Sequence, residues 1–407
     1  MNEYLKTTLL YKLSRYNELY GANSYISIFK LIFFLIRCLF YIPQKWKKAP
    51  LSSEKKLNSV PGSIVFKISG GLGDHLVAAN YIYAFKQKFR IAPENIIIHS
   101  GKSFRNYIFM GITKNIFNES APSIDAPALY IEIIRFPRVI TSNFDISIYH
   151  NDIALKQWIE NQLLFEESNR KYFEYAPFCD GESANLCINL GKKRINQPDI
   201  TNDLGLEEKY LYKGIPVNTT ILDEYGLSGK EFITIHRGVD TDQVKDSIKL
   251  WPLSYYNDLI KRLKEIFPGI KIVQLGISHA RCETMDEIDI NLIEKTSLPD
   301  LGGLLQNARL HIDCEGGLVH FRHALHGGKS IVIFGPTSPD FFGYSENINI
   351  RSPACPIPCE WLVKNWQDEC LRKADKRICM RNLHPDIVIS ELTKNLDSEN
   401  YPSQIKH

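Results

Sequence analysis

The chain has 407 residues, of which 44% are hydrophobic, a length that favours two or more domains with sizeable cores. Its formal net charge of +3 comes from 49 basic and 46 acidic side chains, a balance too even to indicate a nucleic-acid-binding protein. Nine cysteines, an odd number, fit a reducing cytosol better than a set of disulfides. Composition therefore indicates an ordinary globular protein.

Residues 1–60 precede the first convincing strand, and we expect them to form an N-terminal extension. Residues 23–43 are strongly apolar, but Ser27, Lys30 and Arg37 recur at intervals of three and seven residues and so share one helix face. We predict an amphipathic helix on an anionic membrane surface, assisted by three basic residues that follow it, Lys45, Lys47 and Lys48. A helix packed on the protein and a true membrane anchor stay open as alternatives.

The first domain, expected over residues 61–225, opens with the strand Ser63–Ile68. The loop Gly70-Gly71-Leu72-Gly73-Asp74 follows at once and leads into a helix that continues to Phe89. A strand, a glycine loop and a helix begin a doubly wound α/β unit. The glycines lack the spacing of the dinucleotide fingerprint, which argues against a nicotinamide site. Asp74 starts the helix, where an aspartate is also a favoured capping residue.

The rest of this domain alternates short strands at 96–99, 129–133 and 144–149 with loops, followed by a helix over 151–170. Residues 179–229 are rich in turn formers and contain the crossing into the second domain. Four cations are candidate contacts for a charged acceptor, with solvated surface as the simpler interpretation: Lys102, Arg105, Arg135 and Arg138.

The second domain, expected over residues 226–407, begins with a strand, 231–236, that ends in His236. A polar loop leads to Lys249-Leu250-Trp251-Pro252, and a helix over 253–267 and a strand over 270–275, closed by Gly276, come next. The polar loop contains Asp240-Thr241-Asp242, a pair of carboxylates whose oxygens could hold a divalent cation beside phosphate groups. We keep this pair as a rival interpretation.

A strand, a glycine turn, a helix and a second strand follow one another between Arg309 and Pro339. The turn is Glu315-Gly316-Gly317, the helix contains His320, and the second strand ends in Gly335-Pro336-Thr337-Ser338. Open amides at a helix N-terminus point beyond the carboxyl end of the preceding strand, and glycines allow a phosphate to approach them closely. The pattern predicts an anion site, with tight packing as the alternative role of the two glycines.

Taken together, the Gly-Gly-Leu-Gly-Asp loop, the Lys-Leu-Trp-Pro segment and the stretch from Glu315 to Ser338 resemble the bacterial heptosyltransferases, glycosyltransferase family 9. In that family an acidic residue, usually Asp, stands at the position of Glu315, and a hydroxyl residue at that of Gly316. The resemblance implies the GT-B architecture, an α/β fold in which two Rossmann-like domains face each other across a cleft. It also implies that Asp74 serves as the general base and that Lys249 reaches the donor phosphates.

On this resemblance we expect an inverting glycosyltransferase that needs no catalytic metal. It would move a heptose or related sugar from a nucleotide-diphosphate sugar, with ADP-heptose as the expected donor, to a lipopolysaccharide, surface glycan or protein hydroxyl. The expected donor-binding residues are Gly73, His236, Gly276, Glu315, Gly316, Gly317, His320, Thr337 and Ser338. The expected location is the cytoplasm, peripherally on the inner face of the membrane. A sugar-nucleotide epimerase and a non-enzymatic membrane-associated metal-finger scaffold are the rival functions.

Four thiols gather near the C-terminus, at Cys355, Cys359, Cys370 and Cys379, separated by three, ten and eight residues. Thiols at such spacing can converge on one tetrahedral ion. Some members of the family hold an iron in a small cysteine finger, which is similar to this segment. We predict a structural zinc or iron between residues 355 and 379, with free thiols as the alternative.

Overall fold

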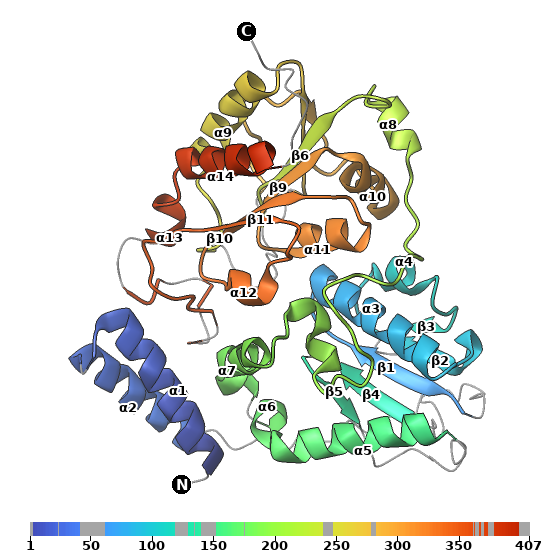
Figure 1. The fold of residues 1–407 in the computed structure, drawn as a ribbon, viewed down its shortest axis with the longest axis vertical. Coiled ribbons are helices and arrows are strands. Elements are labelled where there is room, and N and C mark those ends of the chain that lie inside the picture. Colours follow the sequence, from blue (N-terminus) through green and yellow to red (C-terminus); the bar gives the residue numbers. More distant parts are fainter. Residues whose placement is uncertain are drawn as a thin grey trace. The chain divides into compact units, whose positions relative to one another are not determined.

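The computed structural model describes residues 3–22, 24–40, 62–118, 129–133, 135–139, 152–174, 176–238, 247–277, 282–360, 362, 366–367, 370–372 and 378–398. The predicted strand at 144–149 and the Asp240–Asp242 pair lie outside these residues. The chain divides into two compact units, Met1–Pro216 and Val217–His407, each with a sheet of its own (Figure 1).

The first sheet has the strand order β3-β2-β1-β4-β5. Its strands are β1 (Ile64–Ile68), β2 (Ile96–His99), β3 (Ile116–Phe117), β4 (Leu129–Ile133) and β5 (Pro137–Val139). All neighbours pair in parallel except β4 and β5. The central strands are largely apolar because both of their faces are mostly buried, and their charged members Lys67 and Glu132 pair with each other at 3.1 Å. The helices of this unit are α3 (Leu72–Lys88), α4 (Arg105–Phe109), α5 (Ile153–Ser168), α6 (Arg170–Glu174) and α7 (Ala176–Asn189).

An antiparallel pair of helices, α1 (Glu3–Tyr20) and α2 (Tyr25–Phe40), precedes the first sheet. The predicted helix is present, but its polar stripe does not face solvent, since Ser27 is fully buried and Lys30 is half-buried. The turn before α2 explains this, because the hydroxyl of Ser24 lies 2.8 Å from that of Ser27 and satisfies it locally. Among the described residues, no helix is both long and apolar enough to cross a membrane.

The second sheet is parallel throughout and has the order β11-β10-β9-β6-β7-β8. Its strands are β6 (Phe232–His236), β7 (Lys271–Leu275), β8 (Ile290–Asn291), β9 (Leu310–Cys314), β10 (Ser330–Phe334) and β11 (Ile348–Arg351). Its helices are α8 (Thr220–Glu224), α9 (Leu253–Ile266), α10 (Leu298–Asn307), α11 (Gly317–Ala324), α12 (Pro339–Phe342), α13 (Ile378–Arg381) and α14 (Pro385–Ser398). This is the doubly wound order, and the predicted α/β class with two Rossmann-like units is confirmed.

Doubly wound sheets bind ligands outside the carboxyl ends of their strands, at the point where the strand order reverses. In the second sheet this point lies between β6 and β9, and in the first between β1 and β4. His236 is the last residue of β6, Glu315 follows β9 directly, and Asp74 lies in the first turn of α3, the helix that follows β1. Topology therefore brings the predicted residues of each unit to the edge of the sheet at which a ligand would bind.

Candidate active site

The central feature of the second unit is an ion pair between Lys249 and Glu315. The ammonium Nζ of Lys249 donates to Glu315 Oε2 at 2.6 Å, and the two side chains are 17% and 9% exposed. Trp251 fixes the segment that carries the lysine, because its ring is fully buried and its Nε1 donates to the carbonyl of Leu383 at 2.8 Å. The Lys-Leu-Trp-Pro segment thus holds a cation beside the first residue of the glycine turn.

The glycine turn after β9 leads directly into α11. Gly316 is the residue before the helix and has extended backbone, and Gly317 is the first helical residue. The backbone N–H groups of the first turn of a helix have no partner within it, and they carry a partial positive charge. Lys249 and these amides place positive charge at one edge of the sheet, which is the arrangement that a diphosphate requires.

Thr337 and Ser338 follow β10 at the same edge of the sheet. Both side chains are buried, and no hydrogen-bond partner is present for the Thr337 hydroxyl within the described part of the chain. Ser338 precedes α12, whose Phe342 donates its backbone N–H to the Ser338 carbonyl at 2.9 Å. A buried hydroxyl normally has a partner, so the Thr337 oxygen is a candidate contact for a ligand atom or a water.

His320 points into a group of aromatic side chains that the sequence did not predict. Its Nδ1 forms a hydrogen bond with the hydroxyl of Tyr344, and the two rings meet edge to face with 5.4 Å between their centroids. His323 stacks on the same tyrosine at 3.7 Å and bonds to Glu346. Tyr344 therefore orients both histidines of α11.

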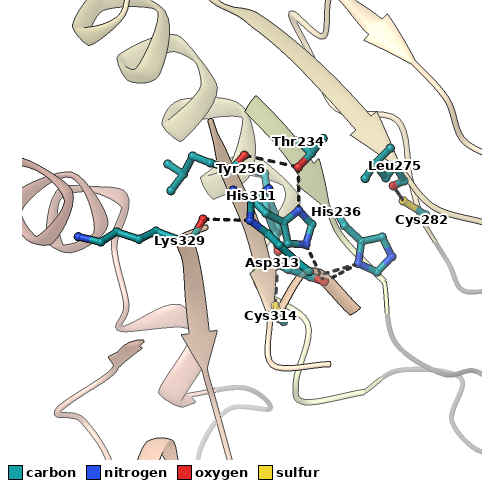
Figure 2. Close-up of polar contacts among 11 residues, drawn as sticks. Thr234, His236, Tyr256, Leu275, Cys282, His311, Asp313, Cys314 and Lys329 are labelled. Carbon is teal, nitrogen blue, oxygen red and sulfur yellow. Dashed lines mark hydrogen bonds and ion pairs between the residues drawn. The ribbon is translucent and has the colours of Figure 1, made fainter. Parts of the chain in front are cut away.

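A buried polar chain crosses β6 and β9 beside the ion pair (Figure 2). Asp313, 2% exposed, accepts from His236 Nδ1 at 2.9 Å, and its Oδ2 lies 3.6 Å from His311 Nε2. The chain continues through a 3.0 Å hydrogen bond between His311 and Thr234. Burial acts to raise the pKa of Asp313, but the adjacent His236 and His311 outweigh it and leave that pKa below its usual value. Asp313 thus fixes the ring of the predicted site residue His236.

Strand pairing explains this polar chain, and the sequence contains a signal for it. Thr234 pairs with His311 in register, and side chains two residues apart on a strand share one face. In both strands an isoleucine lies between two polar residues, at positions 234–236 in β6 and 311–313 in β9. The polar side chains of the two strands therefore lie on the same face of the sheet and contact one another. Gly276 closes the next strand beside them, where an added Cβ would lie 2.4 Å from the sulfur of Cys282 and 3.4 Å from the His236 ring.

In the first unit, Asp74 is held by two donors. Its Oδ2 accepts from the Gly71 backbone N–H at 2.8 Å, and its Oδ1 accepts from the Arg194 guanidinium at 2.5 Å. The first bond is half of a capping box at the start of α3, so the capping role of Asp74 is present. The carboxylate is also 38% exposed, whereas Arg194 is 10% exposed. Asp74 is therefore an oriented carboxylate that solvent reaches, next to Gly73 in the same helical turn.

Arg194 is the functional residue of this unit that sequence reasoning missed. It lies in the 3-10 turn Arg194–Asp199, which also carries Gln197, the acceptor of a second guanidinium bond at 3.0 Å. No local pattern marks it, since it lies 120 residues from Asp74 in the sequence. The other predicted cations are placed on loops and a short strand, with Lys102 and Arg105 at the start of α4 and Arg135 and Arg138 near β5.

The four predicted metal-ligand cysteines lie around the carboxyl end of β10. Cys355, Cys359 and Cys379 are buried and Cys370 is half-buried, and none forms a disulfide. The backbone N–H of Cys359 donates to the carbonyl of Pro336 at 2.9 Å, which ties this segment to the residue before Thr337. Burial raises the pKa of the Cys379 thiol to about 11, with Cys355 and Cys370 adding to the shift. Within the described ranges, no group of three or more His, Cys, Asp or Glu side chains is arranged to hold a metal ion.

Two doubly wound units, each with a sheet of its own, give the chain the fold class of the GT-B glycosyltransferases. Residues 198–365 match the family model for glycosyltransferase family 9 (heptosyltransferase). This match covers the crossing between the units, both Lys249 and Glu315, and the strand end at Thr337. Residues 198–365 are therefore similar to glycosyltransferase family 9, the family that the sequence motifs resemble.

Three solved structures illustrate the fold. The iron-containing dodecameric glycosyltransferase TibC from enterotoxigenic E. coli has a TM-score of 0.51 and 13% identity, covering 84% of this chain and 78% of that one. The ADP-heptose lipopolysaccharide heptosyltransferase II of E. coli gives 0.45 and 14%, covering 83% and 100%. The family 9 glycosyltransferase from Veillonella parvula gives 0.43 and 13%, covering 86% and 100%. No curated protein sequence matches the chain.

Proposed function

We propose that this glycosyltransferase moves a heptose, or a closely related sugar, from ADP-heptose to an acceptor hydroxyl with inversion of the anomeric centre. The description of the matched family supports the sugar class. The observation that carries the proposal is the ion pair between Lys249 and Glu315, because it sets a cation beside the open amides of α11. Expulsion of a nucleoside diphosphate requires positive charge at the departing phosphates.

Each side chain has a task in a direct displacement. Asp74 accepts the proton of the acceptor hydroxyl as that oxygen attacks the anomeric carbon, and the bond from this carbon to the diphosphate oxygen breaks. Arg194 and the Gly71 amide hold the carboxylate in one orientation during this step. Lys249 moves from Glu315 to the diphosphate, and Thr337 offers its hydroxyl there. One displacement of this kind inverts the centre and uses no divalent cation.

The acceptor is a hydroxyl of a lipopolysaccharide, a surface glycan or a protein. The cysteine segment serves a structural purpose in this proposal: it supports the loop after β10 through the bond from Cys359 to Pro336. The four thiols are not arranged to hold the predicted zinc or iron ion in the described part of the chain, so the proposal assigns no step to a metal.

Asp74→Asn provides the test, with ADP-heptose as donor because TibC has been solved with ADP-D-β-D-heptose. The amide keeps a hydrogen-bond acceptor for Gly71 but cannot take a proton. We expect loss of transfer by more than about a thousandfold, a range typical of removing a general base, with nucleotide binding unchanged. The anomeric configuration of the product and activity in the presence of a chelator test the other two parts of the proposal.

Asp152→Asn is the matched control, because Asp152 caps α5 by accepting from the Leu155 N–H at 2.9 Å. Both variants remove a charged cap from a helix of the first unit and are expected to cost about 0.5–1 kcal/mol of stability. If Asp74→Asn retains near-normal transfer, as Asp152→Asn is expected to, Asp74 is only a cap and the assignment of the base is wrong.

A further inference from the structure

We propose that helix α2 docks on an anionic lipid membrane through an apolar face that the protein leaves uncovered. This α2 apolar face recurs every three or four residues along one side of the helix, and each member is between 45% and 92% exposed: Tyr25, Ile26, Phe29, Ile32, Phe33 and Ile36. Exposed apolar residues normally occur singly on a soluble surface, whereas a continuous face marks an interaction site. The proposal is independent of the donor site and of its chemistry.

The buried side of the α1 and α2 hairpin contains polar groups among apolar ones. Ser27 of α2 is fully buried, and Thr8 and Lys12 of α1 are 2% and 3% exposed. Thr8 donates to Glu182 of α7 at 2.8 Å, and the ammonium of Lys12 lies 5.0 Å from the centre of the Phe34 ring, which is also buried. A helix at a water-facing surface turns its apolar stripe toward the protein and its polar side chains outward. The outer side of α2 is apolar instead, which indicates that it meets an apolar medium.

The charge of this region identifies the medium. Residues 22–53 contain no aspartate or glutamate, and they contain five basic residues, Lys30, Arg37, Lys45, Lys47 and Lys48. Aromatic and aliphatic side chains next to basic ones are the composition of a helix that lies in the headgroup region of acidic lipids. A second copy of the chain would bring the same positive charge to the contact and repel it. Because α1 packs on one side of α2, only the opposite side of α2, the α2 apolar face, can contact lipid.

Vesicle flotation of the full-length protein tests the proposal. We expect wild type to float with vesicles that contain phosphatidylglycerol, weakly with phosphatidylcholine alone, and less as sodium chloride is raised. The double variant Phe29→Glu, Phe33→Glu should lower the bound fraction at least about tenfold. The matched control is Ile153→Glu, Leu164→Glu, which charges two exposed apolar positions of α5 in the same unit.

Circular dichroism and nucleotide binding show that each variant is folded before flotation is compared. Equal flotation of the α2 variant and wild type would overturn the proposal, as would wild type that does not float with acidic vesicles. A third outcome also overturns it: wild type that fails to float but forms an oligomer in sedimentation, which the α2 substitutions dissociate, would show that a second copy covers the face.

Discussion

The ion pair between Lys249 and Glu315 gives the sharpest test of the donor site. It is nearly buried, and each of its two residues can be substituted separately. Two unit charges about 4 Å apart attract by about 4 kcal/mol at an effective dielectric constant of about 20. The cost of removing both groups from water offsets part of this energy. We therefore expect a coupling energy of about 2 kcal/mol in a double-mutant cycle with Lys249→Met and Glu315→Gln.

The assay has two arms, urea unfolding and calorimetric titration with ADP. In the first, each single variant should lose about 2–3 kcal/mol of unfolding free energy, and the double variant should lose less than the sum. In the second, Lys249→Met should weaken ADP binding about 10- to 100-fold, the value of one hydrogen bond to a charged group. Glu315→Gln should not weaken ADP binding. In this variant no carboxylate competes with the ADP phosphates for the ammonium group of Lys249.

Lys271→Met is the control for this experiment. It removes the cation of an exposed ion pair in the same sheet, 3.3 Å from Asp289, and pairs of this kind contribute about 0–1 kcal/mol. If the coupling between Lys249 and Glu315 is no larger than this value, and Lys249→Met binds ADP as wild type does, the proposed role of the pair is refuted.

Three further predictions follow from single positions. Gly70 has φ +105°, and an added Cβ would lie 2.2 Å from Asp74 Oδ2. Gly70→Ala should therefore displace the Asp74 carboxylate and reduce sugar transfer at least about tenfold, with ADP binding intact. An unchanged rate of transfer would contradict this prediction. Burial lowers the pKa of His99 from 6.5 to about 4, so its folded form resists protonation and stability falls as pH drops below 6.5. Between pH 7 and pH 4.5, wild type should lose about 2.5 kcal/mol more unfolding free energy than His99→Gln, and equal losses would exclude His99 as the cause. Elemental analysis should find no stoichiometric iron or zinc, because the described cysteines are not arranged to hold a metal ion, and about one ion per chain that is lost in Cys359→Ser would show that the predicted metal site exists.

Periodicity and turn residues predicted most strands and helices of the two sheets. The strands of residues 96–99 and 129–133 have the predicted bounds, because short apolar runs between glycine or polar residues usually form strands in an α/β chain. Helix α1 carried no comparable signal, and its charged residues on both sides hid it. Spacing showed that Ser27 and Lys30 share a face of α2 but not what that face meets, and the structure buries Ser27.

The sequence predicted single candidate residues but not their partners. Asp74, Lys249 and Glu315 each belong to a local motif, with Asp74 at the start of α3 and Glu315 directly after β9. Their contacts depend on the tertiary fold: Arg194 reaches Asp74 across 120 residues, and Glu315 reaches Lys249 across 66. No local pattern encodes such distances. The pairing of His236 with Asp313 was an exception, since matching polar positions on two adjacent strands would have revealed it.

Among the described residues, neither sheet contains a strand from the other half of the chain. The described strands of the first sheet lie within residues 64–139 and those of the second within residues 232–351. The boundary between the two compact units at Pro216 therefore interrupts no described strand ladder. A cut at this boundary leaves each sheet whole, so each half can be expressed and exchanged as a separate unit.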